Sequence, residues 1–197
     1  KQGKIEGDEG AWLGGAFKPF DPSNKDNLTP RIELDRFSTR KDLLRGLDAA
    51  RVAGQSASSV DFYKGQAYDV ILGSAKDAFA TDKEEQSTKD MYGSVKANDI
   101  GEQLLLARRL VEHGTRFVTL HYGGWDMHSN ISSALKNKVS PIDKAIAGFL
   151  EDLDQRGLSE KVLLIVTGEF GRTKINANAG RDHWPSITPM MMAGGAY

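Results

Sequence analysis

The chain contains no cysteine among its 197 residues. This absence excludes disulfide bonds, thiolate-bound zinc and cysteine nucleophiles together, although it does not identify the cellular compartment. The chain also has no apolar run approaching the roughly 18 residues that a bilayer-spanning helix needs, and its N-terminus carries no signal-peptide pattern. The sequence therefore predicts no membrane span.

An excess of either charge is missing as well. The chain has 26 basic and 27 acidic residues, which gives a formal net charge of −1. Because no surplus of cations is available to neutralise a phosphate backbone, nucleic acid is not expected as a partner. Hydrophobic residues make up 39% of the chain and charged residues 27%, which is typical of a globular protein with a single core.

The first 37 residues lack sustained apolar periodicity and are rich in Gly, Pro, Asn and Asp. An unstructured run of this length is unusual inside a compact domain. Region 1–37 is therefore predicted to be an irregular loop lying over a body that is partly absent. Both ends, at Lys1 and Tyr197, are expected to be cuts through a longer protein, so that residues 1–197 form one partial domain.

Residues 38–97 are predicted to be a helical insertion. Ser38 can cap a helix whose apolar positions Leu43, Leu44, Leu47 and Ala50 follow helical spacing. A second amphipathic helix is expected over 59–72, and short helices and turns over 75–97.

Residues 98–197 have a more regular pattern, which predicts an α/β part. Asp99 and Glu102 resemble a capping box for a helix that Gly114 ends after His113. The following elements are expected to be a strand over 115–121, a loop over 122–130, a helix from Ser140-Pro141 to Gly157, a strand over 161–167 and a strand over 187–193. Strands alternating with helices, and apolar runs without alternation, predict parallel pairing with both sheet faces covered.

Three polar loops follow or precede these strands, and they contain most of the chemistry: His121 to His128, Thr167 to Thr173 and Gly180 to Trp184. Sites in open parallel sheets form at the carboxyl ends of the strands. Asp126 and His128 are two residues apart, a spacing that lets a carboxylate and an imidazole converge on a divalent metal.

Further candidates come from the neighbouring loops. Glu169 would add a carboxylate, and His183 or Asp182 a further metal ligand. Arg172 is suited to hold a phosphate or sulfate anion by two parallel hydrogen bonds.

Structural alternatives stand beside these functional interpretations. Asp126 and His128 also suit a turn-capping carboxylate and a surface imidazole. Glu169 and Arg172 also suit an ion pair that orients a loop. Asp182 and His183 also suit a local hydrogen-bonded pair beside a packed Trp184.

These motifs resemble the bacterial family called domain of unknown function 1501. The matching stretches are Ala107 to Glu112, Arg116 to Val118, Gly124 to His128, Asp152-Leu153, Arg156 to Leu158, Gly168 to Thr173, Ile175-Asn176 and Gly180 to Trp184. Weaker similarity reaches back to Leu13 and includes Arg40 to Leu47 and Met91 to Gly93. The resemblance covers most of the chain.

The family is similar to the alkaline phosphatase and sulfatase superfamily, which hydrolyses phosphate or sulfate esters with divalent metals. The resemblance implies a parallel-sheet α/β/α sandwich, incomplete here, and a metal such as Zn²⁺, Ca²⁺, Mg²⁺ or Mn²⁺. It implies Asp126 and His128 as the first ligand pair, Glu169 as the next ligand and His183 as a later one. It also implies a small-molecule or polysaccharide ester as substrate and an exported, periplasmic or extracellular location.

This chain departs from the superfamily pattern in three places. The first ligand pair is two residues apart instead of four, and Phe170 stands where the superfamily has a histidine ligand. The nucleophile is expected before Lys1, so no catalytic residue is assigned and this fragment is expected to be inactive alone. The alternative function is a non-catalytic member of the family that binds a glycan or a protein partner.

Overall fold

A computed structural model describes residues 33, 35–36, 38–43, 75–96 and 99–195. The chain divides into two compact units, Lys1–Phe79 and Ala80–Tyr197, which are taken separately here. In the first unit, residues 35–36 and 38–43 are helical, so a helix is present where the sequence predicts one, but Ser38 is itself helical and does not mark its start; helix α3 spans Ala75–Ala78. The rest of the helix predicted from Ser38, the helix over 59–72 and nearly all of the loop over 1–37 lie outside the described residues.

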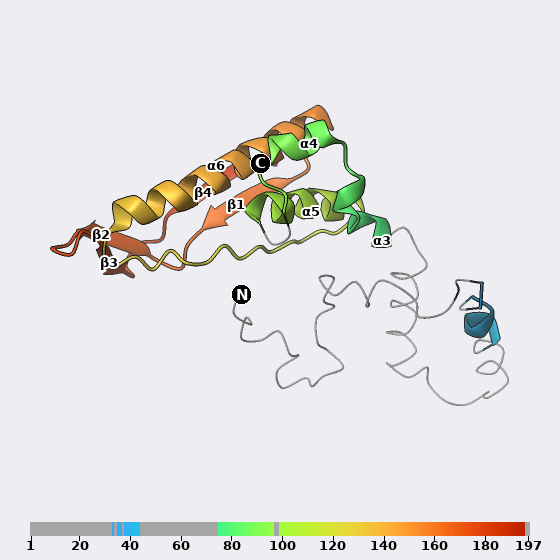
Figure 1. Cartoon of the computed structure of the whole chain (residues 1–197), viewed down its shortest axis with the longest axis horizontal. Coiled ribbons are helices and arrows are strands. Elements are labelled where there is room, and N and C mark those ends of the chain that lie inside the picture. The colour runs from blue at the N-terminus through green and yellow to red at the C-terminus, as the bar shows by residue number, and fades with distance from the viewer. Residues whose placement is uncertain (1–32, 34, 37, 44–74, 97–98, 196–197) are drawn as a thin grey trace. The chain divides into compact units, whose positions relative to one another are not determined.

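The second unit contains four helical segments and four strands (Figure 1). The helical segments are η4 (Thr81–Lys83), α4 (Gln86–Met91), α5 (Ile100–Glu112) and α6 (Ile131–Gln155). The strands are β1 (Leu163–Thr167), β2 (Gly171–Ile175), β3 (Arg181–Trp184) and β4 (Met190–Gly194). The short helical segments over 75–97 and the strand over 161–167 are confirmed. The chain is mixed α/β, and none of its described helices is long and apolar enough to cross a membrane.

The core of this unit lies between α5 and α6. Leu104 and Leu105 of α5 pack with Phe149 and Leu153 of α6, and all four side chains are buried. The buried residues Ile100, Leu104 and Ala107 of α5, and Ala145, Phe149 and Leu153 of α6, are three or four positions apart, which puts them on one face of each helix. Burying a Leu or Phe side chain stabilises a fold by about 1.5–3 kcal/mol.

Glycines end both of these helices, as predicted. Gly114 follows α5 with φ at +91°, and Gly157 follows α6 with φ at +65°. The amide of Leu158 donates to the Leu153 carbonyl at 2.8 Å, which satisfies a carbonyl at the helix end. The helix start predicted at Asp99 is confirmed, because Asp99 is the N-cap of α5, but its side chain makes no cap hydrogen bond and instead accepts one from the Ser94 hydroxyl.

The start predicted for α6 is wrong. The helix begins at Ile131, and Pro141 lies inside it instead of at its first turn. Ile131, Ala134, Leu135 and Val139 continue the helical spacing back to the first turn, but the Ser140-Pro141 pair resembles a helix start, which is why the sequence predicts one there. The early turns are held by tertiary contacts: the Ile131 amide donates to the Ala179 carbonyl at 2.8 Å, and the Asn130 amide donates to the Asn178 carbonyl at 3.1 Å.

The described strands form two antiparallel pairs, β1 with β4 and β2 with β3. The parallel pairing predicted for these strands is therefore wrong. Burial along β1 alternates: Leu164 packs against the core, while Leu163 and Ile165 are exposed. One face of this sheet is uncovered within the described residues, so a continuous apolar run does not here indicate burial on both faces.

The predicted strand over 115–121 is not a strand. Val118 and Leu120 pack against the core, whereas Phe117 is 86% exposed. The side chains alternate as they would in a strand, but no ladder forms with another described segment. Alternating apolar residues indicate which side of an extended segment is buried. They do not make it a strand, because a strand also needs a neighbouring segment with which to form backbone hydrogen bonds.

A buried ion network ties the helices together. Arg108 of α5 has no exposed surface, and its Nε donates to Asp152 Oδ2 of α6 at 2.7 Å. Its guanidinium also contacts Glu112 at 2.6 Å and Glu84, just after η4, at 3.0 Å. The hydroxyl of Tyr92 donates to the same Asp152 oxygen at 2.7 Å. The motif residues Arg108 and Asp152 are therefore joined inside the core.

Candidate metal site

The segment before α6 and the β2–β3 hairpin come together beside the beginning of α6 (Figure 1). The Arg181 amide donates to the Met127 carbonyl at 3.1 Å, and Ser129 forms an isolated bridge with Ala179. These bonds place residues 126–128 alongside β3. Side chains more than 50 positions apart in the sequence therefore meet, although by a hairpin and not by the ends of parallel strands.

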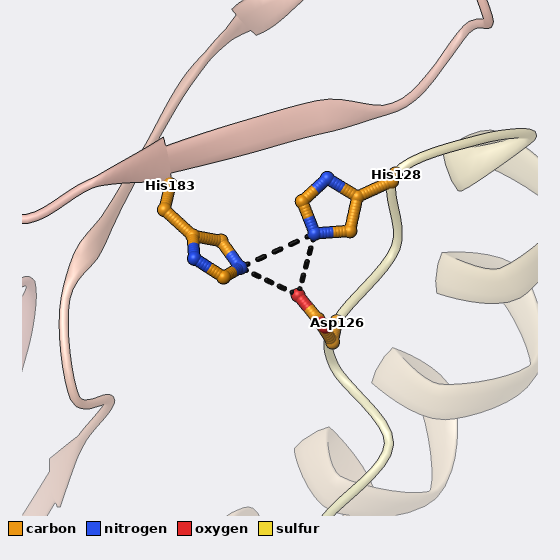
Figure 2. Close-up of side chains that lie close together, drawn as sticks. All are labelled: Asp126, His128 and His183. Carbon is orange, nitrogen blue, oxygen red and sulfur yellow. Dashed lines mark hydrogen bonds and ion pairs between the residues drawn. The ribbon is translucent and has the colours of Figure 1, made fainter.

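Asp126, His128 and His183 form the cluster that we call the metal cluster (Figure 2). Asp126 Oδ1 lies 2.8 Å from His183 Nε2 and 2.9 Å from His128 Nε2. The two imidazole nitrogens are 3.2 Å apart. All three side chains are exposed, Asp126 by 64%. One carboxylate oxygen and two imidazole nitrogens facing a common point are a ligand set for a divalent cation.

Asp182 lies on the other side of the His128 ring. Its Oδ1 is 3.0 Å from His128 Nδ1, opposite the Nε2 that faces the cluster. A carboxylate on the far nitrogen of a ligating histidine fixes the ring's tautomer and orientation. Asp182 thus contacts the ring nitrogen of His128 that faces away from the metal cluster, and it is not part of that cluster among the described residues.

Arg172 and Phe170 lie against the same cluster. Arg172 Nη2 is 2.8 Å from Asp126 Oδ1, so the guanidinium neutralises the carboxylate. The ring of Phe170 is 4.3 Å from the His183 ring and 5.5 Å from the Arg172 guanidinium carbon. Phe170 cannot ligate a metal, and it supports two side chains of the site.

Glu169, the other predicted ligand, and the two further histidines of the chain are not part of this cluster among the described residues. The Glu169 side chain is exposed. His121 is exposed near Gly123, and His113 caps α5, where its Nδ1 lies 2.8 Å from the Arg109 carbonyl.

Asn176 is a site residue that sequence reasoning missed. Its Oδ1 accepts the amides of Asn178 and Gly180 at 3.0 Å each, which closes the β2–β3 turn. Its Nδ2 donates to Asp182 Oδ1 at 3.2 Å. The Asn176-to-Gly180 stretch has the composition of an Asx turn, which signals the turn but not the bond to Asp182.

The charges in the cluster are mutually stabilised. Hydrogen bonds from His183 and Arg172 lower the pKa of Asp126 from 3.8 to about 2. A hydrogen bond to Asp182 and the nearby charge of Asp126 raise the pKa of His128 above 6.5. At neutral pH Asp126 is therefore an anion, and His128 holds a proton more readily than a free imidazole.

Metal binding is accordingly expected to weaken as the pH falls. A histidine binds metal only when its ring is neutral, so a proton on His128 competes with the cation. Because the pKa of His128 is raised, affinity should be full above that pKa and decline below it. Dissociation constants for Zn²⁺ measured between about pH 8.5 and about pH 5.5 test this expectation. An affinity that stays constant over this range would contradict it.

The fold and the cluster together define a mixed α/β protein with a candidate divalent-metal site. The family described as protein of unknown function (DUF1501) matches residues 2–197, and the chain belongs to this family. The resemblance predicted from the motifs is thus confirmed at the level of the family. A search of curated proteins found no match, and a search of solved structures found none either.

Proposed function

We propose that this chain contributes a divalent-metal site to a hydrolase of phosphate or sulfate esters. The observation that supports this best is the metal cluster, whose three ligand atoms lie within 4.8 Å of one another. Two imidazoles and one carboxylate suit Zn²⁺ and Mn²⁺. Three protein ligands leave coordination positions open to water or an ester oxygen, an arrangement that is typical of catalytic metal sites.

The residues around the cluster suit an anionic ester. A bound metal would polarise the ester and lower the pKa of a bound water. Arg172, 2.8 Å from Asp126, has parallel N–H donors that match two oxygens of a phosphate or sulfate group. The exposed cluster is open to a small-molecule or polysaccharide ester.

The relation to the alkaline phosphatase and sulfatase superfamily belongs to the same proposal. Its parallel-sheet sandwich would have to include segments beyond the two antiparallel sheets described. No nucleophile is assigned, and the exported location rests on the resemblance.

The test uses the natural polypeptide that carries this chain. After chelation, the protein is assayed with p-nitrophenyl phosphate and p-nitrophenyl sulfate, with and without Zn²⁺, Mn²⁺, Mg²⁺ or Ca²⁺. Turnover that a metal restores, and that His183→Ala removes, is the expected result. A protein that binds none of these metals and hydrolyses neither ester would overturn this function.

A second candidate function is a family member that binds a glycan or a protein without catalysis. Phe170 favours it, because an aromatic ring lies against His183 at the site's surface instead of a further ligand. Binding to a glycan by metal-free protein, with no ester turnover, would support this alternative.

Replacement of Asp182 by alanine is expected to weaken metal binding about 10- to 100-fold, the usual effect of losing a carboxylate behind a ligating histidine. The His128 ring would lose the partner that orients it. Isothermal titration with Zn²⁺ measures the effect. Asp143→Ala is the matched control, because it removes one exposed carboxylate from α6 away from the cluster. Equal affinity in the two variants would contradict the orienting role.

A further inference from the structure

We infer that Lys138 of α6 is a positioning residue for the metal cluster, because it holds the loop that ends at Asp126. Lys138 Nζ donates to the Gly123 carbonyl at 2.7 Å. The same nitrogen lies 4.9 Å from the Tyr122 ring centroid and 5.5 Å from the Trp125 ring centroid. The ammonium group is thus held by a carbonyl dipole and two aromatic faces.

The loop over 122–125 is folded around this lysine. The indole Nε1 of Trp125 donates to the Tyr122 carbonyl at 2.6 Å, and the two rings meet edge to face with centroids 5.6 Å apart. The Tyr122 hydroxyl in turn donates to the Lys138 carbonyl at 3.4 Å. The side chain and the backbone of Lys138 therefore both bond to one four-residue loop.

Gly124 makes the close approach possible. Its φ is +81°, and a Cβ at this position would lie 2.8 Å from Lys138 Nζ. A side chain there would be strained by the backbone and would also displace the ammonium group. Gly124 is thus favoured at the point where the loop lies against the lysine, whereas a Cβ at Gly123 would instead lie 3.0 Å from the His121 ring.

The position of Trp125 sets the position of Asp126. The two residues are adjacent, so their Cα atoms are about 3.8 Å apart whatever the conformation. On the far side of Asp126, the Met127 amide donates to the Trp125 carbonyl at 2.9 Å, and the Met127 carbonyl accepts the Arg181 amide of β3. Asp126 therefore lies between two anchors, Lys138 on one side and β3 on the other.

Lys138 is separate from the ligands themselves. No contact joins it to the metal cluster among the described residues, so it would act on metal binding only through the loop. Its effect on metal affinity rests on the proposed function, whereas its effect on the loop does not.

The test compares Lys138→Met, Lys138→Arg and the control Lys136→Met in the natural polypeptide. Methionine keeps most of the length of the side chain and removes the charge and the donor, whereas arginine restores both. Lys136 is exposed on the same helix. Lys138→Met is expected to weaken Zn²⁺ binding about tenfold, with partial rescue in Lys138→Arg and no change in Lys136→Met.

A second measurement reads the loop without metal. The indole N–H of Trp125, assigned in NMR spectra by its loss in Trp125→Phe, should exchange with solvent faster in Lys138→Met than in Lys136→Met. If exchange is faster in Lys138→Met but the wild-type protein binds no metal, the anchoring role of Lys138 is supported and the proposed function is overturned. Unchanged exchange in a folded Lys138→Met protein would overturn the inference, as would unchanged metal affinity in a protein that binds metal.

Discussion

Replacement of Arg108 by alanine is expected to lower the free energy of unfolding of the second unit by about 3–5 kcal/mol, the usual cost of removing one partner from a buried ion pair. Arg108 is fully buried and contacts Asp152, Glu112 and Glu84. Loss of the Arg108 side chain would leave the Asp152 carboxylate buried in the core. Its remaining cationic partner would be Arg156, whose side chain is partly exposed.

The pKa values of Glu84 and Arg108 show that each charged group depends on its partners. Burial alone would raise the pKa of Glu84, and hydrogen bonds from Arg108 and Arg109 outweigh that effect, so the pKa lies below 4.5. Burial would lower the pKa of Arg108, and its carboxylate partners raise it instead. Without Arg108, the effect of burial on Glu84 would be opposed mainly by Arg109, and on folding the Glu84 carboxyl would more readily take up a proton.

Urea unfolding followed by circular dichroism at 222 nm measures this effect, because α5 and α6 supply most of the described helix. Arg116→Ala is the matched control, since Arg116 is exposed just after α5. A loss below about 1 kcal/mol in Arg108→Ala, within the range of an exposed ion pair, would show that the network contributes little net stability.

Replacement of Asp126 by asparagine is expected to reduce divalent-metal affinity more than about 100-fold, beyond the effect of losing an orienting partner. Asp126 is the one anionic ligand in the metal cluster, and its Oδ1 lies within 2.9 Å of both histidine nitrogens. With its pKa at about 2, the carboxylate is charged throughout the physiological range. Asparagine keeps the shape and removes the charge.

Equilibrium dialysis with Zn²⁺ and Mn²⁺ measures this loss, and Asp143→Asn is the control of equal charge change. If Asp126→Asn bound metal as tightly as the control, the cluster would be a set of surface hydrogen bonds and not a metal site. In that case Asp126 would serve only as an ion-pair and hydrogen-bond partner of Arg172 and the two histidines.

Local patterns predicted much of the helical structure. The apolar spacing over 100–112 and 142–153 predicted α5 and most of α6, and Gly114 and Gly157 predicted where these helices end. The start of α6 at Ile131 was missed because Ser140-Pro141 resembles a helix start, although apolar spacing extends back to Ile131 and contacts with Asn178 and Ala179 hold the first turn. Local patterns could not predict antiparallel pairing, because strand direction depends on which distant segments meet.

For the candidate site too, local sequence indicated the residue types, whereas their contacts depended on distant parts of the chain. The types and spacing of Asp126 and His128 indicated ligand chemistry, and the loop before the last predicted strand added His183 or Asp182 as a further ligand. Whether Asp182 would be a ligand or would orient one depends on which ring nitrogen it faces, and the sequence carries no information on that point. Lys138 was missed because it lies 12 positions from Asp126 in the sequence, and a single lysine on an amphipathic helix is normally interpreted as a solvent-exposed residue.

The uncovered strand β4 has a consequence for oxidation. Met190, Met191 and Met192 are 60%, 42% and 51% exposed, and they are three of the five methionines in a chain that has no cysteine. The sulfur chemistry of the described structure is therefore concentrated along one strand, where peroxide can reach the thioethers. Conversion to sulfoxides would make this strip polar, because each oxygen added to a thioether is a strong hydrogen-bond acceptor.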